Sequence, residues 1–162
     1  MSDPFDLDLA RDRRSFGRSA RDYDATAVLQ ARVRAELLER LDIVRLEPQA
    51  VLDLGAGTGH ASSALKRRYR TSQVIAVDLA EGMLREARRR QTLLRRFHRA
   101  CGQAAALPLR DASIDLVFSN LMLQWCQDPA EVFGECRRVL RPGGLLTFST
   151  FGPDTLLELR RA

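Results

Sequence analysis

Alternating glycines at positions 55, 57 and 59, followed by an aspartate at position 78, are the residues whose types and spacing point most directly to chemistry. An apolar run that begins at Val51 leads into the turn Asp53-x-Gly55-x-Gly57-x-Gly59, and a second apolar run ends at Asp78, 19 residues after Gly59. Glycine lets the backbone turn sharply and lets a ligand approach without meeting a Cβ. An aspartate at the tip of the second strand can accept hydrogen bonds from both hydroxyls of a ribose. The pattern therefore predicts a site for an adenosine-containing cofactor.

The glycine spacing separates two classes of cofactor. Dinucleotide-binding turns have the spacing G-x-G-x-x-G, which places a pyrophosphate at the N-terminus of the next helix. In this chain the third glycine comes one residue early, which disfavours a nicotinamide-dependent oxidoreductase. A purely structural glycine turn in some other α/β protein is the alternative.

Strands and helices alternate along the chain, which predicts an α/β fold with a three-layer, Rossmann-like, doubly wound and mostly parallel sheet. The ligand of such a sheet binds at the carboxyl ends of the strands, at the topological switch point. We expect a flexible N-terminal segment (1–22) and one domain (23–162). The expected strands are at about 50–54, 73–77, 99–101, 114–119 and 145–150, with a turn at 141–144.

Four helices are expected, one before the first strand and three between strands. The first begins near Tyr23 and ends before Pro48, because apolar residues recur there at helical spacing. The second and third cover about 59–69 and 81–97. The fourth starts at a cap formed by Asp128, with Pro129 in its first turn and Glu131 at the capping-box position. The residues expected to face the core are Leu29, Val33, Leu37, Leu41 and Val44 in the first helix, and Val132, Cys136 and Val139 in the fourth.

Length and composition exclude several classes of protein. A chain of 162 residues with 45% hydrophobic content fits one soluble domain, and it has no apolar run of the roughly 20 residues that span a bilayer. The acidic N-terminus resembles no secretory signal, and three cysteines outside any C-x-x-C pair indicate free thiols in a cytoplasmic protein. With two histidines, no metal site is expected. No membrane partner is expected.

The net charge is +5, and 25 of the 26 basic residues are arginine because Lys66 is the only lysine. Genome base composition accounts for such a bias, and attraction to an acidic partner is the functional alternative. Much of the charge lies in the segment 85–96, which we expect to form a solvated helix face. Little supports nucleic-acid binding, because no aromatic residues are interleaved with the arginines.

Several segments resemble, in order, the class I S-adenosylmethionine-dependent methyltransferases. Besides the D-x-G-x-G-x-G turn, the segment 78–84 resembles their D-x-S-x-x-M-L motif, 104–109 resembles their segment after strand 3, and 140–144 resembles their turn before strand 5. The resemblance covers about residues 50–150. It implies S-adenosyl-L-methionine as cofactor and S-adenosyl-L-homocysteine as product.

A narrower resemblance lies outside these motifs. The segments 16–20, 23–24 and 29–30, then 119–126 and 151–156, resemble the biotin-synthesis BioC family of methyltransferases, which act on malonyl-[acyl-carrier protein]. This resemblance implies O-methylation of the free malonyl carboxylate and an acidic acyl carrier protein as partner.

Two features depart from the class pattern. Gln103 stands where an aspartate usually accepts from the adenine amino group, and a glutamine carbonyl can accept the same bond without the charge. The chain also ends at Ala162, so the sequence predicts a domain that lacks the closing hairpin of strands 6 and 7 and that is C-terminally truncated.

The resemblance implies roles for individual residues. Gly55, Gly57 and Gly59 admit the methionine part of the cofactor, and Asp53 orders the turn and the amino group. Asp78 holds the ribose. Tyr23 is the candidate at the methyl-transfer end, with packing at a helix start as its alternative. The remaining cofactor residues are Leu79 and Met83 on the adenine face, Gln103 and Ala104 at its edge, and Asn120 and Leu121 beside the methionine part.

Two alternative functions stay open. One is a methyltransferase of the same class that acts on another small molecule, such as a quinone precursor. The other is a truncated, non-catalytic module that binds S-adenosylmethionine and turns over poorly or not at all.

Overall fold

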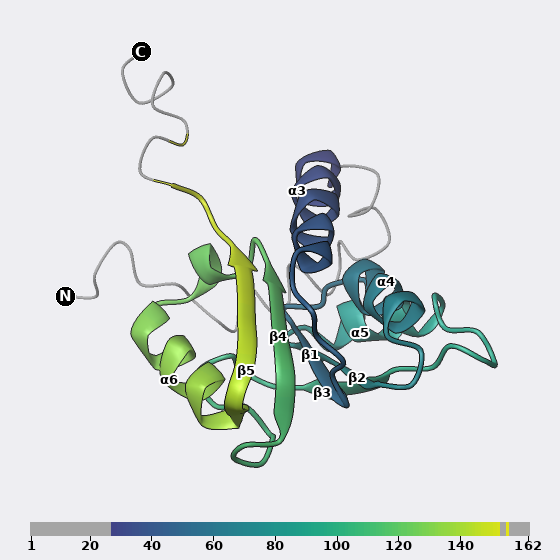
Figure 1. Ribbon diagram of the computed structural model, residues 1–162. Helices are drawn as coiled ribbons and strands as arrows, with labels where there is room; N and C mark the ends of the chain where they lie inside the picture. The colour runs from purple at the N-terminus through teal and green to yellow at the C-terminus, as the bar shows by residue number, and fades with distance from the viewer. Residues whose placement is uncertain (1–26, 153–154, 156–162) are drawn as a thin grey trace.

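Five parallel strands form the sheet on which the site is built (Figure 1). The computed structural model describes residues 27–152 and 155, so Tyr23 and the expected boundary at residues 22 and 23 lie outside the described residues. The strand order β3-β2-β1-β4-β5 reverses direction at β1, which confirms the doubly wound α/β fold. The strands are β1 (Ala50–Leu54), β2 (Gln73–Asp78), β3 (His98–Cys101), β4 (Ile114–Asn120) and β5 (Leu140–Ser149).

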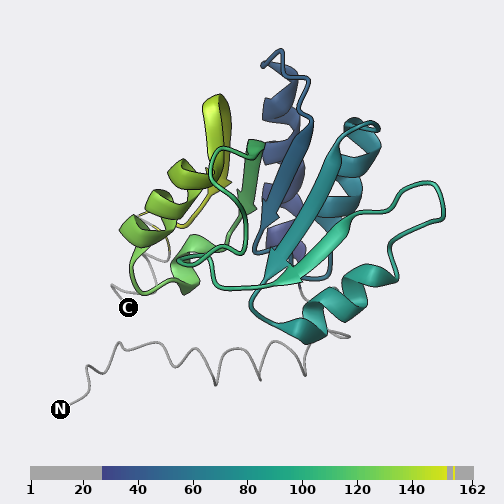
Figure 2. The ribbon, with the colours of Figure 1, turned by 90° about the horizontal axis from the view of Figure 1, so that it is seen from below.

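Helices cover both faces of the sheet (Figure 2). Successive strand residues point to opposite faces, so Val51 packs in one core cluster and Leu52 in the other. The first cluster contains residues of α3 (Val28–Glu39), the 3-10 helix η1 (Arg40–Asp42), α4 (His60–Arg68) and α5 (Glu81–Arg88). The second contains residues of the 3-10 helix η2 (Leu123–Trp125) and of α6 (Pro129–Val139). No helix in the described part of the chain is long and apolar enough to cross a membrane.

The helix α6 forms as the sequence predicts. The Asp128 carboxylate accepts from the N–H of Ala130 at 2.7 Å, and Pro129 occupies the first turn, where its missing N–H has no cost. The three residues expected to face the sheet are all buried in the second cluster: Val132, Cys136 and Val139.

The first helix differs from the expectation. Within the described residues α3 ends at Glu39, and η1 extends it to Asp42, well before Pro48. Only Leu37 and Leu41 of the five expected core residues are buried, whereas Leu29 and Val44 are 52% and 42% exposed. Val44 lies beyond the end of η1 at Asp42, so it is not on the helical face that buries Leu37 and Leu41.

The predicted helix over 81–97 is wrong in its second half. α5 ends at Arg88, and the next three N–H groups donate to carbonyls three residues back, which is turn geometry. The chain then returns to the sheet because Phe97 is buried in the first core cluster. Residues 89–97 are a loop that precedes β3.

The predicted turn at 141–144 lies inside β5. Ile114 pairs with Leu140, and Leu116 pairs with Leu145. Between these two pairs β5 moves forward by five residues and β4 by two, so the pairing of the two strands is irregular here. Asp115 stabilises this irregularity. Its carboxylate accepts from the N–H groups of Gln49 and Ala50, both at 2.8 Å, and from the Arg141 guanidinium at 2.7 Å.

We expect Asp115→Ala to lower the free energy of unfolding by about 1.5–3 kcal/mol at pH 7, the usual range for hydrogen bonds to a charged group. Partial desolvation raises the pKa of Asp115, but its hydrogen bonds and Arg141 together hold that pKa below its usual value. A carboxyl group with a lowered folded-state pKa stabilises the fold above its unfolded-state pKa, near pH 4, and loses this effect as the pH falls through the folded value. Denaturant unfolding from pH 7 to pH 3 should therefore show the difference between the two proteins shrinking in acid.

The control for this experiment is Asp111→Ala. The side chain of Asp111 is 77% exposed and makes an ion pair with Arg138, so its loss should cost less than about 1 kcal/mol. Equal destabilisation by the two substitutions would contradict the role given to Asp115.

Candidate functional site

Two cavities open on either side of the glycine turn, at the carboxyl ends of the strands. The first has a volume of about 260 Å³ and the second about 170 Å³. Gly55, Gly57 and Asn120 line both cavities, so a single ligand can occupy the two together. This position, beside β1 where the strand order reverses, is the one that the fold predicts.

The glycines of the turn serve different purposes. Gly57 has a φ of +53°, and a Cβ added there would meet nothing within 4 Å, so it would point into open space. Gly59 lines neither cavity. A Cβ on Gly59 would lie 2.7 Å from the Cβ of Ala87, so this glycine lets α4 and α5 pack closely. The structure thus places Gly55 and Gly57 at the site and Gly59 behind it.

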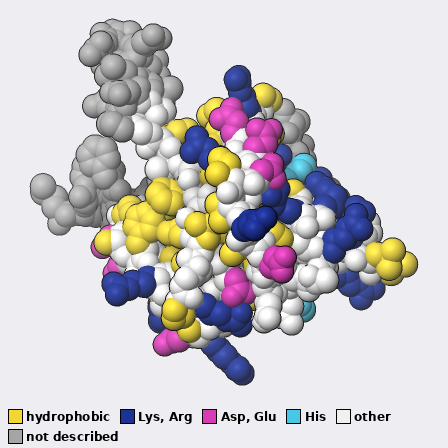
Figure 3. All heavy atoms as spheres, in the orientation of Figure 1, with side chains coloured by type: hydrophobic (Ala, Val, Ile, Leu, Met, Phe, Trp, Pro, Cys, Tyr) yellow, Lys and Arg dark blue, Asp and Glu magenta, His cyan; other side chains and the backbone are white. Residues whose placement is uncertain are grey.

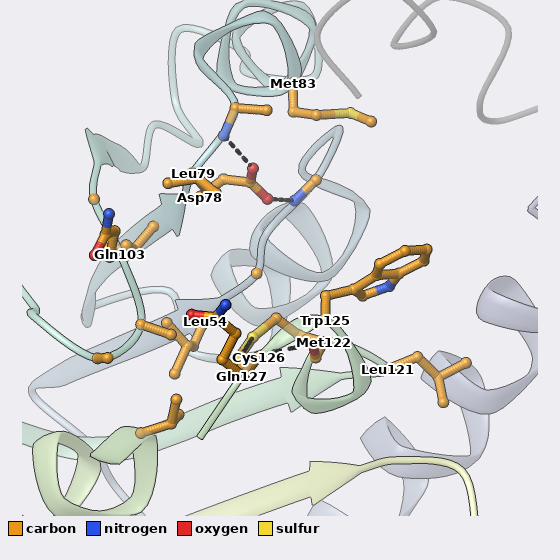
Figure 4. Close-up of a pocket in the computed structure, with 18 of the residues that line it drawn as sticks. Leu54, Asp78, Leu79, Met83, Gln103, Leu121, Met122, Trp125, Cys126 and Gln127 are labelled. Atoms are coloured by element: carbon orange, nitrogen blue, oxygen red, sulfur yellow. Dashed lines mark hydrogen bonds between the residues drawn. The ribbon is translucent and has the colours of Figure 1, made fainter. Parts of the chain in front are cut away.

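Asp78 lies at the end of β2 and holds the glycine turn (Figure 4). One carboxylate oxygen accepts from the N–H of Gly57 and the other from the N–H of Ala80, both at 2.8 Å. Burial raises the pKa of this carboxyl group, and the two hydrogen bonds oppose that shift. A carboxylate has about four acceptor positions, so two stay available to a ligand in the first cavity.

The remaining walls of the first cavity come from four segments of the chain. Leu79 and Met83 follow β2, Gln103 and Ala104 follow β3, and Leu121 follows β4, as the sequence predicts. Met83 is buried, whereas Gln103 is exposed at the rim. Figure 4 shows Asp78 on one side of the cavity and residues of the η2 segment on the other. The sequence assigned no role to these last residues: Met122, Trp125, Cys126 and Gln127.

Asp53 lies in the second cavity and is almost completely buried. Its carboxylate accepts a hydrogen bond from the Ser62 hydroxyl. Burial raises the pKa of Asp53 to about 7, and Asp78 adds to the shift, while the Ser62 bond and the Arg34 guanidinium oppose it. Arg34 of α3 and His60 of α4 line the same cavity. The sequence did not single out Arg34, because 25 arginines gave no means of choosing one, and it assigned no role to His60.

Asn120 fixes α3 beside the second cavity. Its amide nitrogen donates to the carbonyl of Gln30 at 3.1 Å, and its amide oxygen accepts from the Ser149 hydroxyl at 3.1 Å. The N–H of Leu121, a residue with a φ of +49°, donates to Ser149 as well. Asn120 therefore joins α3 to the ends of β4 and β5, and it places Arg34 over the cavity.

The geometry suits binding and orientation. The first cavity combines apolar walls with the carboxylate of Asp78, and Asp128 and Glu131 also line it. The second cavity combines a buried carboxylate with a guanidinium. No group of three or more potential metal ligands exists among the described residues. Such a site fits a ligand with a nucleoside at one end and a charged amino-acid group at the other.

A family model described as a methyltransferase domain matches residues 52–148. The chain belongs to this methyltransferase domain family. The match begins in β1 and ends in β5, so it contains most of the residues that line the first cavity.

Known relatives refine the comparison. The chain is 56% identical to the malonyl-[acyl-carrier protein] O-methyltransferase of Methylovorus sp. over 99% of its own length and 56% of that protein. Proteins of the same name from other bacteria are 42–55% identical. The chain spans about half the length of these relatives.

Solved structures agree on the fold. The methyltransferase in complex with the Haloferax volcanii Trm112 activator is 26% identical, with a TM-score of 0.73, over 83% of this chain and 59% of that one. Phosphoethanolamine N-methyltransferase 1 of Haemonchus contortus, solved with phosphoethanolamine and S-adenosylhomocysteine, is 25% identical, with a TM-score of 0.67, over 85% of this chain and 32% of that one.

We expect Gly57→Val to abolish detectable binding of S-adenosylhomocysteine in calorimetry, because the new side chain would fill the space that joins the two cavities. The matched control is Gly143→Val. Gly143 also has a positive φ, +79°, with nothing within 4 Å of an added Cβ, but it lies in β5 and lines neither cavity. Both variants bear a backbone strain of about 1–3 kcal/mol. Normal binding by Gly57→Val would mean that the ligand site lies elsewhere.

Proposed function

We propose that this chain contains the cofactor site of an S-adenosylmethionine-dependent methyltransferase that methylates the free carboxylate of malonyl-[acyl-carrier protein]. The observation that carries the proposal is the pair of cavities joined at Gly57, with Asp78 in one and with Asp53 and Arg34 in the other. The acceptor is supported by the names of the relatives, which are up to 56% identical to this chain.

The first cavity suits the adenosine part of the cofactor. The two acceptor positions that remain on Asp78 match the two hydroxyls of a ribose. Leu79 and Met83 offer apolar surface to an adenine ring, and the Gln103 carbonyl offers an acceptor for its amino group. Ala104 completes this edge.

The second cavity suits the amino-acid part. An α-ammonium and an α-carboxylate need opposite charges from the protein, and Asp53 and Arg34 supply them within one cavity. A guanidinium binds a carboxylate through two parallel hydrogen bonds. We therefore assign the carboxylate of the cofactor to Arg34 and its ammonium to Asp53.

The chemistry asks little of the protein beyond positioning. When bound, S-adenosylmethionine supplies an electrophilic methyl group on a sulfonium. A malonyl carboxylate is already ionised at pH 7, so no general base is needed. The residues of the chain orient the two reactants in line and exclude water, which together can lower a barrier by about 7–11 kcal/mol. Tyr23 stays our candidate for the methyl-transfer end.

The cytoplasm is the compartment that we propose, since Cys101, Cys126 and Cys136 are all free thiols.

The acceptor is tested by transfer of a radiolabelled methyl group from S-adenosylmethionine to malonyl-[acyl-carrier protein], to a quinol and to RNA. We expect label on the malonyl carrier, and less label at subsaturating cofactor with Asp78→Ala, which should weaken cofactor binding by about 1.5–3 kcal/mol. Asp42→Ala is the matched control, because Asp42 is exposed and pairs with Arg68 away from both cavities. Label on the quinol alone would favour a small-molecule methyltransferase. Cofactor binding without transfer to any acceptor would favour a non-catalytic module.

The assignment of Arg34 is tested by comparing S-adenosylhomocysteine with 5′-methylthioadenosine, which lacks the amino-acid group. We expect Arg34→Met to weaken binding of the first ligand by about 1.5–3 kcal/mol and to leave the second unchanged. Equal losses for both ligands would show that Arg34 acts through the fold. A normal affinity for S-adenosylhomocysteine with a raised KM for the acceptor would move Arg34 to the acceptor carboxylate.

A further inference from the structure

The loop between α5 and β3 carries two leucines at its tip that have almost no protein contact. Leu93 is 83% exposed and Leu94 is 93% exposed. They occupy a tight turn that is closed by a hydrogen bond of 3.2 Å from the N–H of Arg95 to the carbonyl of Thr92. Figures 1 and 2 both show this loop extending away from the sheet, on the side of α4 and α5.

The base of the loop is anchored to the domain. The Gln91 side-chain amide donates to the carbonyl of Phe97 at 2.7 Å, and the Phe97 ring is buried in the core. The Arg90 side chain donates to the carbonyl of Thr58 at 2.8 Å. The exposed turn therefore projects from a fixed position.

The segment from Arg88 to Arg99 contains the excess positive charge of the whole chain. It has six arginines and no acidic residue, whereas the other 20 basic and 21 acidic residues leave the rest of the chain at −1. The net charge of +5 is thus a local property of the segment from Arg88 to Arg99.

Four of these arginines flank the leucines in the sequence and have exposed side chains. Arg88, Arg95 and Arg96 have no acidic partner within the described part of the chain, and Arg89 pairs with Glu86 at 3.1 Å while staying 67% exposed. Figure 3 shows dark-blue side chains gathered beside a protruding yellow group, on the side where Figure 1 places the loop. We call Leu93, Leu94 and the four arginines Arg88, Arg89, Arg95 and Arg96 the basic tip.

We propose that the basic tip docks on an anionic lipid surface. Exposed leucines enter the boundary between headgroups and acyl chains, and arginines beside them contact the headgroup phosphates. This contact needs no membrane-spanning segment, so it differs from the kind of membrane association that the apolar runs of the sequence exclude. Membrane association of this kind is independent of the proposed function.

A protein partner fits the basic tip less well. A stable protein interface buries roughly 1,000 Å² or more, and a convex turn with two leucines offers no groove of that extent. A carrier protein that delivers a substrate must face the cavity, which includes Gly102 and Ala105 after β3, whereas the loop precedes β3.

Nucleic acid also fits less well. Binding of single strands relies on aromatic side chains among the basic residues, and leucines at the tip contribute nothing to phosphate contacts.

The test is flotation of the 162-residue chain with two kinds of vesicle: phosphatidylglycerol mixed with phosphatidylcholine, and phosphatidylcholine alone. We expect binding to the anionic vesicles only, weakened by salt. The double substitution Leu93→Ser with Leu94→Ser, and separately Arg95→Gln with Arg96→Gln, should each reduce the bound fraction roughly tenfold. Ile43→Ser is the matched control, because Ile43 is 85% exposed and lies outside the basic tip. Equal melting temperatures verify that all variants fold.

Absence of binding to the anionic vesicles would overturn the proposal. Equal binding to both vesicle types would do the same, as would an equal loss with Ile43→Ser. Unchanged binding by the leucine variant would also refute it, because the proposal assigns insertion to those two side chains. If the leucine variant instead loses binding to malonyl-[acyl-carrier protein] or RNA, the surface serves that macromolecule and not a lipid.

Discussion

The turn after β1 is held against the end of β2, and both cavities depend on this contact. The N–H groups of Gly55 and Ala56 donate to the carbonyl of Val77 at 2.9 and 3.0 Å, and the N–H of Gly57 donates to the Asp78 carboxylate at 2.8 Å. β1 and β2 are parallel, with Leu54 opposite Val77, so the residues that follow both strands emerge at the same level of the sheet. Because of this register, one carboxylate can order the glycine turn and still face a ligand. The two tasks of Asp78 therefore cannot be separated by substitution of that residue alone.

The same arrangement buries two carboxyl groups, those of Asp53 and Asp78, and burial disfavours their charged forms. Burial raises the pKa of both Asp53 and Asp78, and Asp78 adds to the shift of Asp53. An uncompensated buried charge destabilises a fold, and in the free protein the hydrogen bonds from Ser62, Gly57 and Ala80 and the charge of Arg34 offset this cost. A ligand that carries a positive charge would offset part of this cost. The electrostatics thus favour a cationic or zwitterionic ligand over one that carries phosphates.

The sequence predicted the sheet and the first cavity well because both follow from local patterns. Strand periodicity, the glycine spacing and Asp78 are encoded within about 30 residues, and the parallel fold brings their ends together. The sequence-based prediction failed where contacts between residues far apart in the chain determine the local structure. The helix expected over 81–97 ends at Arg88, and the chain returns to the core at Phe97, which meets its core partners only in the folded chain. The role of Arg34 depends on the bond between Asn120 and Gln30, which are 90 residues apart.

The net charge of the chain does not show where the charged residues lie. A value of +5 suggested a basic protein attracted to an acidic carrier. That excess lies in the segment from Arg88 to Arg99, while Asp128 and Glu131 line the first cavity. Electrostatic attraction acts over about one Debye length, roughly 8 Å at physiological salt, so charge on the loop contributes little to a partner beyond that range. An acidic carrier that approaches the first cavity meets these two carboxylates, so the net charge of the chain does not by itself predict attraction at that surface.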